Sequence, residues 1–537
     1  MMPVRGLRGV VDRYGLPICL LLGVLGSVLQ KQDASWDLRN YHLYNAWAML
    51  HGRQSLDLVA AGMQSFFNPL LDLPYYLLGT GPLEHMPRVL AGLQGLWYGG
   101  LVFVLLRIAA RLADLQGRVF DASDLFAVLI GATGTMAVSQ LGMSSNEMPL
   151  ALLVLLAICL LLPICVSEPT ARSGRRVLLA GLLCGLAAGL KPTAIVYPPA
   201  MMCALLAASG WRHRAWRLGL LFAGAALGGF LVAYGWWGWA LYRLTGNPVF
   251  PMFNQVFRSG WVPTVSGTDG QFLPRSIGQW LFYPFYWVRE NQRVVTEVSF
   301  ADPRYALGML ALLGLALSAW FRRRQPPRGR EAMRLLAVFV ALAYVAWLAL
   351  FSILRYAIPI EALTGLLALA ALRALSWRAH GGGAWRPWLA WCMAGLFLLS
   401  AGCSRYPNWG HVRYAGAVFD VRAPAVEPGS LVLVMGQPLA YVVPFIGNAQ
   451  SSRFVGLTWF NQKAADERLG VFTRERLHDH IGPVYALLNG HAAASLPVLR
   501  QWLPGAQLAG KCEAISSAME RYPRDGIGVQ LCRVSRR

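Results

Sequence analysis

Long apolar runs separated by short polar stretches fill the first three quarters of the chain. A helix needs about 20 apolar residues to cross the hydrocarbon core of a bilayer, so runs of this length favour membrane-spanning helices. The pattern predicts about eleven spans, near residues 14–29, 86–106, 125–141, 148–165, 177–190, 194–208, 218–241, 305–321, 335–353, 357–375 and 388–401. The fifth and sixth runs are short and meet at Lys191-Pro192, which indicates either one broken helix pair or a tight outward turn.

The apolar pattern changes beyond about residue 403. Residues 431–435 read as a buried strand, 465–469 and 496–503 as helices, and 529–534 as a closing strand. We therefore expect a polytopic α-helical membrane domain over 1–403 and a small α/β domain over 404–537. Two loops, at 30–85 and 243–303, are long enough to be functional rather than simple connections.

Composition excludes a soluble enzyme. Hydrophobic residues make up 56% of the 537 residues and charged residues only 14%, against roughly 25% charged in ordinary globular proteins. The net charge of +22 does not indicate a nucleic-acid partner, because the basic residues gather in every second short loop. Arg8 and Arg13 precede the first run, and Arg107, Arg111 and Arg118 follow the second. This bias places the N-terminus in the cytoplasm and the tail on the opposite, extracytoplasmic side, with the first run as a retained signal anchor.

Cysteines and missing motifs narrow the chemistry. Cys512 and Cys532 lie in the tail, in the compartment where a disulfide would persist, and the sequence leaves both the bridged and the free form open. No phosphate-binding Gly-x-x-x-x-Gly-Lys-Ser/Thr loop, Gly-x-Ser-x-Gly elbow or strand-linked Gly-x-Gly-x-x-Gly motif occurs. Nucleotide-driven transport and serine hydrolysis therefore lack their usual signatures.

The first loop carries the strongest candidate chemistry. Aromatic residues at helical spacing after Asp37 predict a helix that lies along the membrane interface, with Asp37 at its N-terminus. One interpretation makes Asp37 a helix cap, since Asp favours that position. The other makes it a general base, which takes a proton from an attacking hydroxyl.

The chain resembles the C-type glycosyltransferases at this point. The residues Asp37, Tyr41, His42, Tyr44 and Ala46, directly after the first run, look like the opening of these enzymes. The stretch FNPLLDLPY at 67–75 resembles a bacterial branch of the superfamily. The resemblance covers roughly residues 10–375. It implies an inner-membrane enzyme with an extracytoplasmic catalytic loop, a polyprenyl-phosphate-linked sugar as donor, inversion at the anomeric carbon and, in some members, a divalent metal such as Mg or Mn.

Two further stretches strengthen the resemblance. GLAAGLKPT at 185–193 contains Lys191, and RYAIP at 355–359 begins with Arg355. Arg355 is predicted at the extracytoplasmic end of a span, where a guanidinium can bind two oxygens of the donor phosphate. The alternative is an interfacial Arg that reaches lipid headgroups. Lys191 is either a second phosphate contact or a boundary residue between two spans.

Three other residues complete the candidate site. Glu147 precedes the fourth run and is either a second acid beside Asp37 or a helix N-terminal residue. Tyr41 and His42 are candidate substrate contacts, and His42 is also a candidate metal ligand. No His-x-x-x-His or Cys-x-x-Cys spacing supports a protein-built metal cage, so the metal stays undecided.

The sequence thus predicts a membrane glycosyltransferase, hexosyl or pentosyl, that acts on an acceptor which is a lipid, a glycan or a protein. We also expect the protein to contact membrane lipids. A multi-span transporter or lipid flippase is the alternative, and a noncatalytic envelope-polysaccharide assembly protein is the third. The leading hypothesis requires Asp37 and Arg355 to converge at the outer membrane boundary and to enclose a cavity wide enough for a lipid headgroup.

Overall fold

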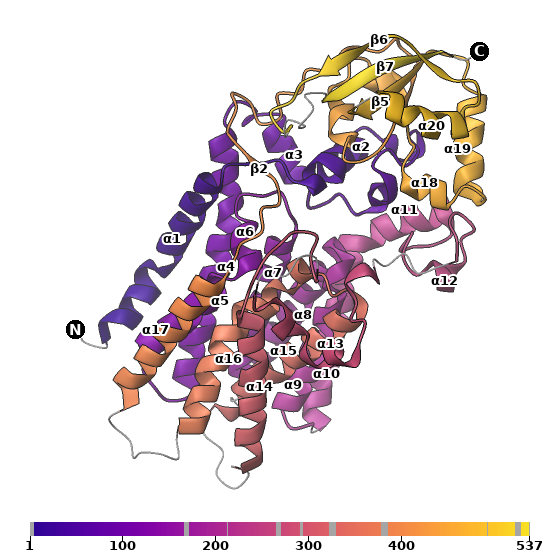
Figure 1. The fold of residues 1–537 in the computed structure, drawn as a ribbon. Coiled ribbons are helices and arrows are strands. Elements are labelled where there is room, and N and C mark those ends of the chain that lie inside the picture. Colours follow the sequence, from indigo (N-terminus) through magenta and orange to yellow (C-terminus); the bar gives the residue numbers. More distant parts are fainter. Residues whose placement is uncertain are drawn as a thin grey trace.

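The computed structural model describes residues 5–165, 171–211, 213–264, 270–289, 294–321, 329–376, 385–490, 492–520 and 528–535. Long helices form a bundle at one end, and a β-sheet with short helices forms the other end (Figure 1). Helices of the first loop lie between the bundle and the sheet (Figure 1).

Apolar helices occur wherever the sequence predicts a span. Among the described residues, eight helices are long and apolar enough to cross a membrane, and three shorter apolar helices accompany them. The helices of the bundle are α1 (Arg5–Gln30), α4 (Pro87–Leu115), α5 (Ala122–Ala132), α7 (Glu147–Leu161), α8 (Ala171–Leu190), α9 (Tyr197–Ala208), α10 (His213–Phe230) continued by α11 (Trp236–Thr245), α14 (Arg304–Phe321), α15 (Arg330–Leu350), α16 (Ile358–Ser376) and α17 (Trp385–Cys403). The exact number of crossings stays a prediction.

The predicted third span is interrupted. Helix α5 ends at Ala132, and a separate short helix, α6 (Thr135–Ser139), follows it. The side chain of Glu361 in α16 accepts hydrogen bonds from the backbone N–H groups of Met136 and Ala137, at 3.0 and 3.1 Å. A carboxylate at a helix N-terminus satisfies otherwise unpaired donors, so Glu361 stabilises the break.

Glycines allow helices α8 and α10 to pack closely. Gly181, Gly185 and Gly189 follow each other at helical spacing along α8. A Cβ atom built on Gly185 would lie 1.9 Å from the carbonyl oxygen of Ala226 in α10. Small residues at such crossings let helix backbones approach, which is a common basis of helix association in membranes. Two glycines of the GLAAGLKPT stretch therefore have a packing role.

The first loop forms a series of short elements. They are β1 (Gln32–Asp33), the π-helix η1 (Leu38–His42), α2 (Leu43–Leu50), the 3-10 turns η2 (Arg53–Ser55) and η3 (Gly62–Phe66), and α3 (Leu73–Gly79). The helix predicted after Asp37 is present as η1 and α2, but its Tyr41 and Tyr44 are buried inside the protein rather than exposed at the membrane interface. In the second long loop lie α12 (Asn254–Phe257) and α13 (Ile277–Phe282).

The tail contains a five-stranded mixed sheet. Its strands are β3 (Leu431–Val434), β4 (Arg453–Gly456), β5 (Val484–Asn489), β6 (Gln507–Ile515) and β7 (Val529–Ser535), in the order β4-β3-β5-β7-β6. β3 is parallel to β4 and β5, whereas β7 is antiparallel to β5 and β6. The helices α18 (Trp459–Lys463), α19 (Arg468–His478) and α20 (Ala492–Trp502) accompany the sheet.

Most of the predicted tail elements are present. The strand predicted at 431–435 contains β3, and the one at 529–534 lies in β7, which is an inner strand. The helix predicted at 465–469 is wrong, because most of it is a turn between α18 and α19. There the backbone N–H groups of Arg468 and Leu469 donate to Gly260 and Trp261 of the second long loop, instead of continuing a helix. Cys512 and Cys532 form a disulfide between β6 and β7.

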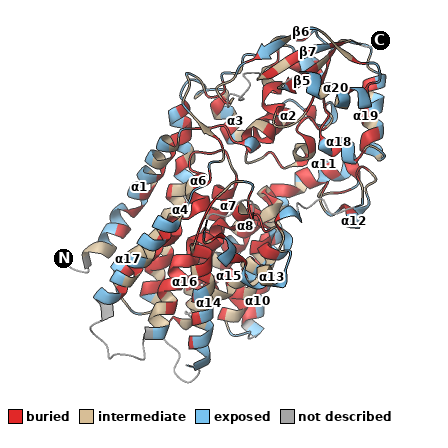
Figure 2. Cartoon of the chain, viewed as in Figure 1, coloured by how far each residue is buried: buried red, intermediate tan, exposed pale blue. Residues whose placement is uncertain are grey.

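The first loop and the tail share one hydrophobic core. Leu38, Tyr44 and Trp47 pack in the same buried cluster as Phe454 and Leu487 of the tail. Helix α2 and the strands β3 and β5, which contribute to the same core, are largely buried (Figure 2). Backbone pairing adds to the packing, since β1 pairs with β2 (His411–Val412) and Leu58 forms a parallel bridge with Val455. The loop and the tail therefore form one body above the helical bundle.

Candidate active site

Four charged side chains from four distant segments meet where the first loop contacts the bundle. Asp37 stands at the start of the first-loop helix, Glu147 is the first residue of α7, Lys191 lies between α8 and α9, and Arg355 lies in the turn before α16. Arg355 Nη1 is 2.5 Å from Asp37 Oδ2, and Lys191 Nζ is 2.6 Å from Glu147 Oε1. Arg355 Nε lies 3.7 Å from that same Glu147 oxygen. The four groups form one chain of alternating charge.

The four charges are removed from solvent. The side chains of Asp37 and Lys191 are each 11% exposed, that of Glu147 is 3% exposed and that of Arg355 19%. Charges this deep are tolerated only when they are paired, because desolvation of an isolated charge costs several kcal/mol. Two acids and two bases balance each other here. Arg355 is thus held inside the protein, rather than extended to lipid headgroups.

Asp37 is an ion-pair partner and not a helix cap. It occupies the position before η1, but its side chain makes no capping hydrogen bond. Burial raises the pKa of its carboxyl group, but the charges of Arg355, His42 and Lys191 outweigh burial and hold the pKa below its ordinary value. Asp37 is therefore ionised at neutral pH, as a group that accepts a proton must be.

Short polar contacts hold the turn before Glu147 against the first loop. The Asp33 carboxylate accepts hydrogen bonds from the backbone N–H and the hydroxyl of Ser144, at 2.7 and 2.8 Å. Glu147 begins α7 and also pairs with Lys191, so it is both a helix N-terminal residue and a member of the charged cluster. Its second oxygen, Oε2, is buried and has no hydrogen-bond partner among the described residues.

His42 is oriented by a carboxylate that the sequence did not indicate. His42 Nδ1 lies 2.6 Å from Asp72 Oδ1, and Asn146 Nδ2 donates to that oxygen at 3.0 Å. Burial disfavours the charged imidazole, but the Asp72 carboxylate raises the pKa of His42 above its ordinary value, and Asp37 adds to the effect. His42 Nε2 is buried without a hydrogen-bond partner among the described residues, so one ring nitrogen is available for a substrate.

Tyr41 adds a neutral aromatic wall. Its ring centroid lies 4.2 Å from that of His42, and the side chain is buried. Burial and the nearby Asp37 carboxylate raise the pKa of the Tyr41 hydroxyl well above its ordinary value. On the other side, the Tyr356 ring lies 5.5 Å from Arg355 Cζ and 5.6 Å from Lys191 Nζ. Both distances allow a cation–π attraction, which fixes the basic side chains.

Asn68 fixes the chain just before Lys191. Its amide donates to the carbonyl oxygens of Gly189, at 3.1 Å, and Ala233, at 2.9 Å. Helix α8 ends at Leu190 and a 3-10 turn begins at Pro192, so the chain is broken at Lys191 as the sequence suggested. Asn68 and Asp72 both lie in the FNPLLDLPY stretch, and that stretch was the only signal that could have found them.

A resident divalent metal does not fit this donor set. Each carboxylate of the cluster already faces a basic side chain, and Lys191 and Arg355 would repel a second cation. Within the described ranges, no group of three or more His, Cys, Asp and Glu side chains could hold a metal ion.

Asp37 and Arg355 do not enclose the expected cavity, because they contact each other as an ion pair. A cavity of about 1150 Å³ begins at Tyr44 and Asn45, which follow Tyr41 and His42 by one helical turn. Asp37 and Arg355 do not line it. In the arrangement described, their ion pair fills the space between them.

No protein-family model and no curated protein sequence matches the chain. Solved structures do. ArnT from Cupriavidus metallidurans bound to undecaprenyl phosphate matches with a TM-score of 0.51 and 14% identity over 97% of both chains. The same protein in the apo state matches with a TM-score of 0.51 and 13% identity, over 96% of this chain and 97% of ArnT. Arabinofuranosyltransferase AftD from Mycobacteria matches with a TM-score of 0.52 and 14% identity, over 98% of this chain and 40% of AftD.

These similarities confirm the predicted fold class. ArnT and AftD are C-type glycosyltransferases, and the match extends over the helical bundle and the tail alike. At 13–14% identity the likeness is one of fold. The chain is a multi-pass membrane protein with the fold of the C-type integral membrane glycosyltransferases.

Proposed function

We propose that the protein transfers a sugar from a polyprenyl-phosphate carrier to an acceptor on the extracytoplasmic face of a bacterial inner membrane. The observation that carries the proposal is the buried cluster of Asp37, Arg355, Glu147 and Lys191. A carboxylate for the acceptor proton and two cations for the leaving phosphate are the groups that this reaction needs. The undecaprenyl phosphate bound to ArnT supports the class of donor.

Asp37 acts as the base in this mechanism. The acceptor hydroxyl attacks the anomeric carbon, its proton moves to the Asp37 carboxylate, and the bond between that carbon and the phosphate oxygen breaks. The electron pair of the broken bond leaves with the polyprenyl phosphate. A single displacement of this kind inverts the anomeric centre, for a hexosyl or a pentosyl donor alike.

Arg355 and Lys191 stabilise the leaving group. Their positive charges now face Asp37 and Glu147 at 2.5 and 2.6 Å. A donor phosphate that enters between them replaces carboxylate oxygens by phosphate oxygens, which frees Asp37 to accept the proton. Tyr41 and His42 lie near enough to Asp37 for its charge to raise their pKa values, so they are the candidate contacts for the donor sugar or the acceptor. Glu147 keeps Lys191 and Arg355 in place.

The disulfide supports the sidedness of the proposal. Cys512 and Cys532 are bridged, and such bonds persist outside the cytoplasm. The tail and the first loop share one core, so both face the same compartment. This agrees with the arginine bias, which places the N-terminus in the cytoplasm and the tail in the periplasm.

The test compares Asp37→Asn with Glu84→Gln, because Glu84 is an exposed acid of the same loop. Both proteins are purified into nanodiscs and supplied with a polyprenyl-phosphate sugar and envelope glycolipids. We expect Asp37→Asn to lower the transfer rate about 10²- to 10⁴-fold, the usual contribution of a general base, and Glu84→Gln to match the wild type.

Measuring the affinity for undecaprenyl phosphate separates the role of the base from that of the phosphate-binding cation. Arg355→Gln is expected to lose affinity for undecaprenyl phosphate, whereas Asp37→Asn is expected to keep it. A folded Asp37→Asn protein with unchanged transfer would refute the mechanism. Movement of the lipid across sealed vesicles without any glycosylated product would instead favour a flippase.

A further inference from the structure

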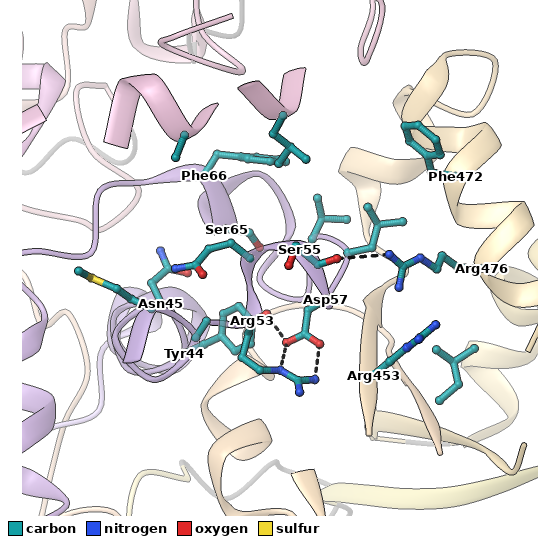
Figure 3. Close-up of a pocket in the computed structure, with 18 of the residues that line it drawn as sticks. Tyr44, Asn45, Arg53, Ser55, Asp57, Ser65, Phe66, Arg453, Phe472 and Arg476 are labelled. Carbon is teal, nitrogen blue, oxygen red and sulfur yellow. Dashed lines mark hydrogen bonds and ion pairs between the residues drawn. The ribbon is translucent and has the colours of Figure 1, made fainter. Parts of the chain in front are cut away.

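The cavity beside the charged cluster has three walls from distant parts of the chain. The first is the end of α2 with η2, the second is α11, and the third is α19 with the starts of β3 and β4 (Figure 3). Its volume of about 1150 Å³ exceeds the roughly 300–1000 Å³ typical of sites for small ligands. The cavity therefore has room for an extended ligand.

One wall is apolar and aromatic. Trp236 of α11 is 39% exposed, and Leu244 at the end of the same helix is 41% exposed. Phe472 of α19 and the buried Phe66 also line the cavity (Figure 3). Flat aromatic faces of this kind can pack against the C–H surface of a sugar ring.

The polar wall has balanced charge. Arg53 and Asp57 neutralise each other at 2.6 Å and are buried. Arg453 and Arg476 face the cavity together with the acids Glu475 and Asp479, so the remaining formal charges also cancel. Arg476 donates to the carbonyl oxygens of Ser55 and Leu56, which fixes its position (Figure 3).

This composition selects among ligand classes. An anionic headgroup would meet Glu475 and Asp479 as well as the arginines, so it gains little net attraction. An acyl chain would remove water from Arg453, Arg476 and the two acids without replacing their hydrogen bonds, which is unfavourable. An uncharged sugar offers hydroxyl groups that both donate and accept hydrogen bonds, so it can satisfy guanidinium and carboxylate groups at once.

The cavity begins about two helical turns beyond the candidate base. Asp37, Tyr41, Tyr44 and Asn45 follow each other along one continuous helical stretch, and Tyr44 lies about two turns, or roughly 10 Å, from Asp37. We propose that the cavity binds the uncharged sugars of an acceptor glycan and presents its terminal hydroxyl to Asp37. This inference rests on the proposed glycosyl transfer and adds the class of acceptor.

The first test is binding. Wild type, Trp236→Ala and Arg453→Ala in nanodiscs are applied to an array of neutral and acidic oligosaccharides. The matched controls are Trp239→Ala, on the same helix but outside the cavity and 62% exposed, and Arg422→Ala, whose side chain is 80% exposed. We expect neutral glycans to bind to the wild type and both controls, and at least tenfold more weakly to the two cavity variants.

The second test is kinetic. Trp236→Ala and Arg453→Ala are expected to raise the KM for the acceptor at least tenfold, while the affinity for undecaprenyl phosphate stays that of the wild type. Binding of acidic glycans only, of lipid vesicles only, or of no glycan overturns the inference. Neutral-glycan binding that depends on the cavity, in a protein without transferase activity, would refute the proposed function but retain the glycan site.

Discussion

At the scale of single residues, the charged cluster owes its geometry to hydrogen-bonding neighbours outside the cluster. Asp33 fixes the turn before Glu147, and Asn68 fixes the backbone before Lys191. The charged members could be nominated from the sequence because Asp37, Lys191 and Arg355 lie in stretches that resemble the C-type glycosyltransferases, and Glu147 directly precedes an apolar run. Asn68 and Asp72 were not nominated although they lie in the FNPLLDLPY stretch, since nothing in their spacing separates a buried hydrogen-bonding side chain from a solvated loop residue.

The Asp72 carboxylate predicts a pH dependence. It raises the pKa of His42 in the folded protein, so the stabilising contribution of this pair is present below the ordinary pKa of histidine. The contribution is lost as the pH rises through the raised value. If protonated His42 assists transfer, Asp72→Asn should lower the pKa of His42 and move the alkaline limb of the rate profile to lower pH.

Initial transfer rates of wild type and Asp72→Asn between about pH 5.5 and 9 test this prediction. Glu84→Gln serves as the control, since Glu84 is exposed and should leave the profile unshifted. Coincident alkaline limbs for wild type and Asp72→Asn would show that Asp72 does not act through His42.

At the scale of elements, the helices of the bundle were the most predictable part of the fold. A run of about 20 apolar residues admits few interpretations, so helices occur at all the predicted runs. The break after Ala132 was missed because it depends on Glu361, which lies far along the chain. The helix predicted at 465–469 failed for a similar reason, since the second long loop supplies the competing hydrogen bonds.

The crossing of α8 and α10 gives an element-scale prediction. Gly185→Ala places a methyl group 1.9 Å from the Ala226 carbonyl oxygen, so the helices must separate. We expect a loss of about 1–3 kcal/mol, the usual range for overpacking, and a lower Tm in detergent. Transfer should fall as well, because α8 leads directly into Lys191.

Gly228→Ala in α10 is the matched control, because nothing lies within 4 Å of its added Cβ atom. This substitution should be neutral or stabilise the helix by up to about 1 kcal/mol. Equal Tm values for the Gly185 and Gly228 variants would contradict the packing role of Gly185.

At the scale of the whole molecule, the first loop and the tail are held together by polar groups as well as by their core. Arg53 donates to the backbone carbonyl oxygens of Gln450 and Ser452, and Asp57 accepts from the backbone N–H of Phe454. The sequence could not predict this union. Strands of two residues, such as β1 and β2, are too short to carry a periodic pattern, and about 380 residues separate them along the chain.

Removal of Arg53 should loosen this union. Arg53→Met leaves Asp57 buried without its partner, and breaking a buried pair in this way costs about 3–5 kcal/mol. We expect a lower Tm and faster proteolytic cleavage of the tail. The double variant Arg53→Met/Asp57→Leu removes both charges and should recover part of the loss. A double variant less stable than the single one would contradict this account.

The shared core also governs when the protein matures. Leu38 and Tyr44 emerge early in synthesis, but they pack with Leu531 of β7, almost 500 residues later. At roughly 5–20 residues per second, the ribosome needs about 25 to 100 s to cover that distance. The core around the first loop therefore stays incomplete until β7 has been synthesised. If the proposed function is correct, a nascent chain without β7 should have no transferase activity.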